Sequence, residues 1–225
     1  MGIRLLELLP SVTRFDHLLE ETRALYEVSF PPQERRPFEE ITSLLGTDSE
    51  DRARILVAVE GNEVLGLSIF RYIPSVRIGY LWYLCVSESA RGRQVGTSLY
   101  RASVNRLVEA GARALVFEVE PLSARVPPVY GDPLRRIRFY ERLGARPVIG
   151  YEYVQPPIPP YGPVRLELMV HLLDGRSDCP GWELAEIIDG WLSSLGRVHE
   201  EVPPSVRLGS IADLVAREKD QGLGQ

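Results

Sequence analysis

Two short stretches of this 225-residue chain carry residue types that could do chemistry. The first is Arg91–Thr97, where two glycines and two arginines stand between an apolar run and a helix-like run. The first turn of a helix presents unpaired N–H groups, and glycine allows a ligand to approach the backbone closely. The pattern therefore predicts a phosphate-binding turn, with a capped turn carrying solvated arginines as the alternative. It is neither a Walker motif nor a dinucleotide fingerprint, because Gly-Lys-Ser/Thr and G-x-G-x-x-G are absent.

The second stretch is Arg136–Ala145, which contains Phe139-Tyr140 and ends in Leu143-Gly144. In this order and spacing the two stretches resemble the GNAT superfamily of acyl-CoA N-acetyltransferases. That family's signature is an (Arg/Gln)-x-x-Gly-x-(Gly/Ala) turn after a strand, followed by a Phe-Tyr-x-x-Leu-Gly-Phe-like helix end. The resemblance covers about residues 12–172. Phe30-Pro-Pro-Gln-Glu-Arg and Tyr153-Val-Gln-Pro-Pro further resemble a bacterial subgroup of the family.

The resemblance implies acetyl-CoA as co-substrate and no metal. Main-chain N–H groups of the turn would bind the CoA pyrophosphate, the preceding strand end would bond the pantetheine, and an aromatic ring would pack on the cofactor. The cofactor-binding residues implied in this way are Leu84, Cys85, Val86, Arg91, Gly92, Arg93, Gln94, Val95, Gly96, Thr97 and Phe139. Gln94 stands where the signature has its first glycine, so one close backbone approach is lost.

By the same resemblance, the Tyr140 hydroxyl would protonate the departing CoA thiolate. A base is also needed, because an ammonium has no lone pair and an alkyl amine with a pKa of ~10.4 is mostly charged at neutral pH. Many family members carry a strand glutamate where this chain has Trp82. Glu118 and Glu120 alternate with Val119, so we expect both carboxylates on the substrate face, with Glu118 as the base. Two solvated acids on an edge face are the alternative.

Candidate substrate-binding residues are Glu27, Glu34, Trp82 and Glu120. The first two flank the Phe30-Pro-Pro linker and could hold a cationic substrate, although surface acids explain them as well. The predicted function is transfer of acetyl from acetyl-CoA to a primary amine, on a small molecule or a peptide, in a ternary complex. The alternative is a non-catalytic acyl-CoA-binding or protein-interaction module, which the missing strand glutamate and the acidic tail suggest.

The elements that must position these residues follow from hydrophobic spacing and from Gly and Pro signals. Helices are predicted at 13–29, 37–45, 94–110, 133–143, 182–195 and near 211–218. Strands are predicted at 54–60, 63–73, 77–86, 114–120, 148–154 and 164–172.

These elements predict an α/β (α+β) fold. The family's sheet is mixed and mostly antiparallel, with one parallel, splayed strand pair and flanking helices, and the strand–helix–strand order of 77–120 favours that parallel pair. We expect an acetyltransferase domain over 1–173 and an acidic helical extension over 174–225. The extension would cover the acceptor site or form a homodimer contact.

Composition narrows the class of protein. Hydrophobic residues make up 44% and charged residues 25%, which is ordinary for a globular chain. No apolar run approaches the roughly 18 residues of a membrane span, and the first residues lack a signal-peptide pattern, so we expect a cytoplasmic protein without membrane contact. The net charge of −5 arises beyond residue 173, where 5 basic and 10 acidic residues lie, and no basic stripe predicts nucleic-acid binding. Two distant cysteines and three scattered histidines predict neither disulfides nor a metal site.

Overall fold

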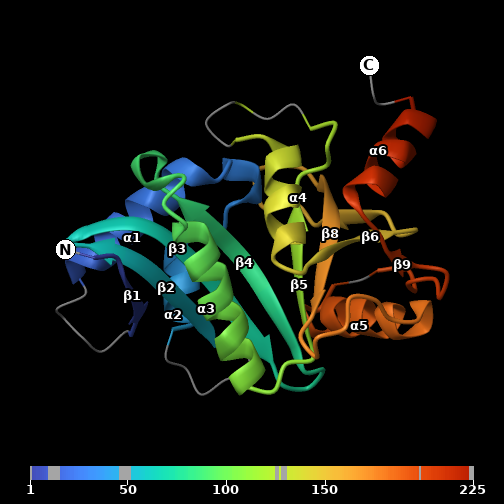
Figure 1. The fold of residues 1–225 in the computed structure, drawn as a ribbon, viewed down its shortest axis with the longest axis horizontal. Helices are drawn as coiled ribbons and strands as arrows, with labels where there is room; N and C mark the ends of the chain where they lie inside the picture. The colour runs from blue at the N-terminus through green and yellow to red at the C-terminus, as the bar shows by residue number, and fades with distance from the viewer. Residues whose placement is uncertain are drawn as a thin grey trace. The chain divides into compact units, whose positions relative to one another are not determined.

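The computed structural model describes residues 2–9, 16–45, 52–124, 127, 131–197 and 199–222. The chain forms two compact units, one of Met1–Pro74 with Gly79–Ala112 and one of Ser75–Ile78 with Arg113–Gln225. Figure 1 shows that each unit contains both strands and helices. Within each unit the strands β1–β2–β3 and β5, β6, β7, β8 and β9 pair antiparallel, which confirms the predicted α/β class with a mostly antiparallel sheet.

The first unit holds four strands in the order β1-β2-β3-β4. Its elements are β1 (Arg4–Leu8), α1 (Asp16–Ser29), α2 (Phe38–Ser43), β2 (Ala53–Glu60), β3 (Glu63–Ile73), β4 (Ile78–Val86) and α3 (Val95–Glu109). The sequence patterns predict all of these except β1 to within a few residues. The predicted start of the first helix, residues 13–15, lies outside the described residues.

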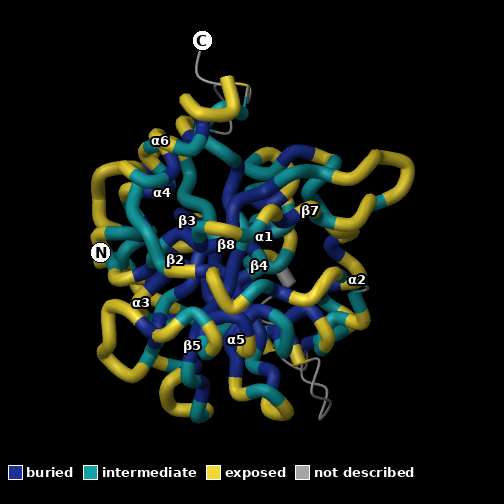
Figure 2. The backbone as a smooth tube through the Cα atoms, turned by 90° about the vertical axis from the view of Figure 1, so that its right-hand side faces the viewer, coloured by how far each residue is buried: buried dark blue, intermediate teal, exposed yellow. Residues whose placement is uncertain are grey.

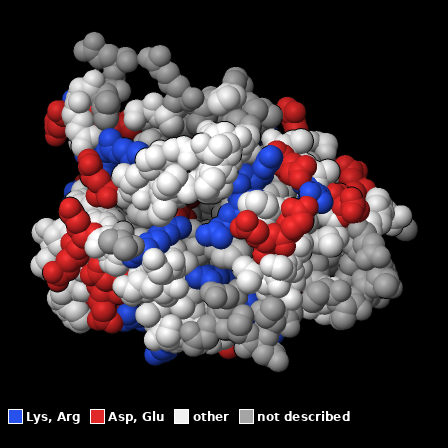
Figure 3. Space-filling model, turned by 180° about the vertical axis from the view of Figure 1, so that it is seen from behind, with Lys and Arg blue, Asp and Glu red and all other residues white. Residues whose placement is uncertain are grey.

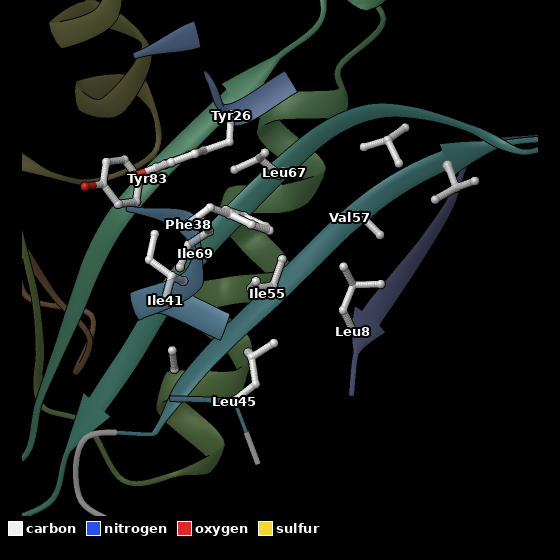
Figure 4. Close-up of a cluster of buried hydrophobic side chains, with 13 residues drawn as sticks. Leu8, Tyr26, Phe38, Ile41, Leu45, Ile55, Val57, Leu67, Ile69 and Tyr83 are labelled. Atoms are coloured by element: carbon white, nitrogen blue, oxygen red, sulfur yellow. The ribbon is translucent and has the colours of Figure 1, made fainter. Parts of the chain in front are cut away.

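Alternation along β3 divides the helices of this unit between two faces. Leu67 and Ile69 join a buried cluster with side chains of α1 and α2, including Tyr26 and Ile41 (Figure 4). Ser68, which lies between them, points to the opposite face of the sheet. It hydrogen-bonds Ser103 of α3, with 2.8 Å between the hydroxyl oxygens. The α3 helix therefore covers the opposite face of the same strands, and its N-terminus is fixed against them.

The second unit contains β5 (Ala114–Val119), α4 (Pro133–Arg142), β6 (Arg146–Ile149), β7 (Tyr153–Gln155), β8 (Val164–Leu172), α5 (Gly181–Ser194), β9 (Arg207–Leu208) and α6 (Ile211–Asp220). Its strands follow the order β5-β8-β6-β9, and β7 also pairs with β8. The single strand predicted at 148–154 is thus two strands, because Gly150 takes a φ of +89° and interrupts the run. Strand β9 was not predicted.

The tail beyond residue 173 packs within this second unit. Helix α5 contacts β5, and helix α6 contacts both α4 and β6. The side chains of Leu184, Ile187, Ile188 and Trp191 on α5 are fully buried. Figure 2 shows the buried class, in dark blue, concentrated in the interior of the molecule. The predicted division at residues 173 and 174 stays a prediction, but these contacts join the tail to the strands before it.

Charge is mixed on the surface: on the face seen in Figure 3, Lys and Arg side chains lie between groups of Asp and Glu. Among the residues that the structure describes, no helix is both long enough and apolar enough to cross a membrane. Within the same described ranges, no three His, Cys, Asp or Glu side chains gather as a group that could hold a metal ion.

Candidate functional site

The predicted phosphate turn lies at the N-terminus of α3 and leaves backbone donors unused. Gly92 has a φ of +80° and Gln94, which precedes the helix, a φ of +62°. The first hydrogen bond of the helix runs from the Ser98 N–H to the Gln94 carbonyl over 3.0 Å. Because the opening N–H groups of a helix have no partner within it, the amides of residues 95–97 are available to an anion. Gln94 thus adopts the left-handed conformation that glycine would adopt without strain.

The two arginines of the turn have different surroundings. The Arg91 N–H donates to the Glu88 carbonyl (3.2 Å) and the Arg93 N–H to the Ala90 carbonyl (3.3 Å). The Arg93 side chain also donates through Nη2 to both carboxylate oxygens of Glu60, at 2.8 and 2.9 Å. Arg93 therefore anchors the turn to the end of β2, whereas the Arg91 side chain is exposed.

The end of β4, residues 84–86, is half-buried. Burial raises the pKa of the Cys85 thiol to about 12, so the thiol stays protonated at neutral pH. A Cβ atom on Gly66 would lie 2.8 Å from the Cys85 carbonyl oxygen and 3.1 Å from the Val95 side chain. The absence of a side chain at Gly66 thus lets the strand end and the start of α3 approach the same point of β3.

Two phenols fix the Phe30–Arg36 segment between α1 and α2. The Tyr83 hydroxyl donates to the Glu34 carbonyl and accepts from the Arg36 N–H, each over 3.1 Å. The Tyr26 hydroxyl donates to the Arg36 carbonyl over 2.8 Å. The two rings lie edge to face, with centroids 4.8 Å apart (Figure 4). Burial raises the pKa of Tyr26, so its hydroxyl keeps the proton that it donates.

The predicted substrate residues of this unit differ in their surroundings. The Glu27 carboxylate accepts from Arg23 Nε over 3.0 Å on the exposed surface of α1. The Trp82 ring lies beside two guanidinium groups, with Arg36 at 5.7 Å and Arg71 at 5.5 Å from its centroid. These are cation–π distances. The structure therefore brings Trp82 to the Phe30–Arg36 segment, in a cationic setting rather than beside the Glu27 carboxylate.

In the second unit, Tyr140 is buried on α4. Its ring centroid lies 4.5 Å from that of Phe117 on β5 and 5.0 Å from that of Phe139. The helix begins where the sequence predicts, because Asp132 caps it by accepting from the Leu134 N–H over 2.9 Å. Tyr140, the predicted general acid, is thus held by aromatic packing on a helix whose N-terminus is capped.

The Glu118 carboxylate is part of a nearly buried network. Tyr153 of β7 donates its hydroxyl to Glu118 Oε1 over 2.9 Å, and Arg197 Nη1 lies 3.3 Å from the same oxygen. Arg197 Nη1 also contacts the Tyr153 hydroxyl. Neither partner is a predicted site residue: Tyr153 lies in a stretch that resembles the bacterial subgroup, whereas nothing in the local sequence marks Arg197.

Glu120, which the sequence predicts on the same face as Glu118, lies just beyond the end of its strand. Strand β5 ends at Val119, so the side-chain alternation does not extend to Glu120. Its buried carboxylate pairs with Arg136 of α4, the helix on which Tyr140 lies. One shared face for Glu118 and Glu120 stays a prediction, and the two carboxylates have different partners, Tyr153 and Arg197 for the first and Arg136 for the second.

A surface pocket of about 740 Å³ lies elsewhere in the second unit. Trp182 and Asp189 of α5, Arg77 of the turn before β4, and Arg113 are among its lining residues. None of the sequence-predicted site residues lines it. The pocket therefore does not enlarge the predicted site.

The α/β fold, the turn at the start of α3 and the aromatic end of α4 are each features that the sequence analysis expects of an acyltransferase, and the family comparison supports that class. Residues 15–145 match the family described as the acetyltransferase (GNAT) family. Because this match covers more than half of the chain, the chain belongs to the GNAT acetyltransferase family. Transferase class and acetyltransferase family are thereby established, and acetyl-CoA is the co-substrate typical of that family.

Solved structures support the fold. A protein assigned to the GNAT family of acetyltransferases from Bacteroides thetaiotaomicron has a TM-score of 0.61 at 20% identity, covering 88% of this chain and 99% of that chain. The ribosomal-protein-S18-alanine N-acetyltransferase of Escherichia coli has a TM-score of 0.53 at 14% identity, covering 76% of this chain and 94% of that chain. At these identities the likeness shows the fold alone. No curated protein matches the chain at a significant level.

Proposed function

We propose that this protein transfers the acetyl group of acetyl-CoA directly to a primary amine within a ternary complex. The observation that carries the proposal is the N-terminus of α3, where the amides of residues 95–97 are left free behind the left-handed Gln94. The positive end of a helix dipole with unpaired N–H groups is a binding site for phosphate. In a GNAT-family chain this site suits the CoA pyrophosphate.

The remaining cofactor contacts follow the sequence prediction. The backbone of residues 84–86 would hydrogen-bond the pantetheine, and Phe139 would pack on the cofactor. The Arg93 side chain is held by Glu60, so it would shape the turn while the exposed Arg91 supplies positive charge. On the acceptor side, Trp82 and the Phe30–Arg36 segment would contact the substrate, with Glu27, Glu34 and Glu120 as further candidates.

The proposed reaction moves one acyl group and two protons. Glu118 takes a proton from the ammonium, and the freed lone pair attacks the thioester carbonyl carbon. A backbone N–H at the end of β4 stabilises the resulting oxyanion. When the tetrahedral intermediate collapses, the C–S bond breaks and the Tyr140 hydroxyl protonates the thiolate. The nitrogen gives up its second proton, which restores the Tyr140 hydroxyl, and Glu118 returns its proton to solvent, so that a neutral amide and CoA leave.

The first test measures CoA release from acetyl-CoA with a panel of polyamines, amino sugars and peptides. In the Tyr140→Phe variant we expect kcat to fall roughly 10²–10⁴-fold, the usual contribution of general acid catalysis, at nearly unchanged CoA affinity. Tyr161→Phe is the matched control, because Tyr161 is exposed and should leave kcat unaltered. An unchanged rate in Tyr140→Phe would exclude that hydroxyl, and failure to bind CoA in calorimetry would overturn the function.

The second candidate is an acyl-CoA-binding or protein-interaction module without catalysis. It is favoured by Trp82 at the position of the family's strand glutamate and by the acidic tail beyond residue 173. Tight binding of acetyl-CoA, without release of CoA in the presence of any amine, would identify this module.

A cytoplasmic location and a homodimer contact through the tail are further predictions of the sequence.

A further inference from the structure

The Arg197 side chain belongs to the tail but is directed into the network around β5. It follows the end of α5 by three residues, beyond the 15–145 range of the family match. Its guanidinium lies over two rings, 5.3 Å from the Trp191 centroid and 5.5 Å from the Tyr153 centroid. Only 14% of the side chain is exposed. Aromatic contacts on a guanidinium restrict its orientation, so the cation is held toward Glu118.

Tyr153 and Arg197 act on the same oxygen of Glu118, at 2.9 and 3.3 Å. The Glu118 side chain is 9% exposed. A carboxylate buried to this degree is stable as an anion when a cation and a hydroxyl donor satisfy it. The two contacts therefore favour the anionic form of Glu118 and fix its rotamer, and a deprotonated, oriented carboxylate is the form that can accept a proton.

Other charges around Glu118 are engaged with one another. Its cross-strand partner on β8 is the apolar Leu168. Acids just after β5, on β8 and on α5 pair with bases of α4, α6 and the tail. These pairs are Glu120 with Arg136, Glu167 with Arg217, and Asp189 with His199. Arg197 is a cation that pairs directly with Glu118.

We propose that Arg197 and Tyr153 are positioning residues for Glu118, and that the C-terminal tail is thereby a working part of the acetyltransferase site. The inference rests on the proposed function, in which Glu118 accepts the proton of the amine. It assigns a role to a segment that the family match leaves out, and it makes the activity of this chain depend on a residue 79 positions beyond the base.

The test is the pH profile of kcat/KM for the full chain with an amine that it acetylates. In Arg197→Gln the carboxylate loses its cation and becomes easier to protonate, so the acid limb should move to higher pH by roughly one unit or more. Arg197→Lys keeps the charge and should move the limb less. Tyr153→Phe removes one hydrogen bond and should lower kcat/KM roughly tenfold. Glu118→Gln should abolish the acid limb.

Arg176→Gln is the matched control. Arg176 is a tail arginine in an exposed ion pair with Asp174, so this change should leave the profile unaltered. An acid limb that stays in place in Arg197→Gln, with only the melting temperature lowered, overturns the inference and leaves the proposed function standing. If Arg197→Gln does not fold, a Tyr153→Phe variant with the wild-type kcat/KM overturns it equally. A wild-type chain that releases no CoA on any amine overturns both proposals.

Discussion

Cys85 stands on the strand end that would hold the thioester, where a thiol could be mistaken for a nucleophile. Burial raises the pKa of this thiol to about 12, and a thiolate is the form that attacks an acyl group. Direct transfer therefore fits the residue better than an acetyl-cysteine intermediate. We expect Cys85→Ala to keep kcat within roughly threefold, because the proposed contacts at this position come from the backbone.

Mass spectrometry after mixing with acetyl-CoA alone provides the measurement. The wild-type protein should carry no acetyl group on Cys85. Cys179, whose pKa burial raises to about 11, serves as the comparison thiol within the same chain. Stoichiometric acetylation of Cys85 before any amine is added would contradict direct transfer.

Most single residues of the candidate site could be named from the sequence, but their partners could not. The glycines of the turn and Tyr140 belong to local motifs, so a window of ten residues suffices to find them. The contact between Glu118 and Arg197 spans 79 positions and depends on how α5 packs against β5. No local pattern carries that information, because it arises only when distant elements are packed.

At the scale of elements, the start of α3 depends on one unusual backbone conformation. Gln94 has a φ of +62°, which costs an L-residue roughly 1–2 kcal/mol. Gln94→Gly removes that strain and adds the backbone entropy cost of glycine, about 0.5–1 kcal/mol. We therefore expect a net gain of up to about 1 kcal/mol in the free energy of unfolding, measured by urea denaturation.

Gln94→Val provides the opposite control for this position. A β-branched residue is a genuine outlier in the left-handed region, so this variant should lose about 1 kcal/mol or more. CoA affinity should persist in the glycine variant, since the amides of residues 95–97 stay in place. A glycine variant less stable than the wild type would show that the turn relaxes in solution to another conformation.

Element boundaries show what periodicity can and cannot predict. Strands β3 and β8 match their predicted ranges, because β-branched and aliphatic residues between turn signals define them. Strand β1 was missed, because Arg4 and Glu7 interrupt its leucines and an edge strand needs only one buried face. In the structure Glu7 accepts from Arg106 of α3 over 2.8 Å, a partner that the sequence pattern does not reveal.

At the scale of the whole molecule, the two compact units allow a test of cooperativity. Leu214 of α6 is 1% exposed, and its truncation to alanine should cost about 2–4 kcal/mol. Because α6 contacts α4 and β6, hydrogen-exchange protection should fall in these elements of the second unit. Protection in β2 and β3 of the first unit should be retained.

The neighbouring residue supplies the control for this experiment. Val215 is 37% exposed on the same helix, so Val215→Ala should change stability by less than about 1 kcal/mol. Equal loss of protection in both units of Leu214→Ala would mean that the chain unfolds as one cooperative body. The division of the chain into two compact units would then have no thermodynamic counterpart.

The Phe30–Arg36 segment, held by the hydroxyls of Tyr26 and Tyr83, has a consequence for selectivity. A backbone tied at two carbonyls and one amide has little freedom left to lose, so a ligand that touches it incurs a small ordering cost. The Phe30–Arg36 segment therefore does not change its conformation to suit each amine substrate. Discrimination among amines would then come from fit to a rigid outline, which favours a narrow range of acceptors over a broad one.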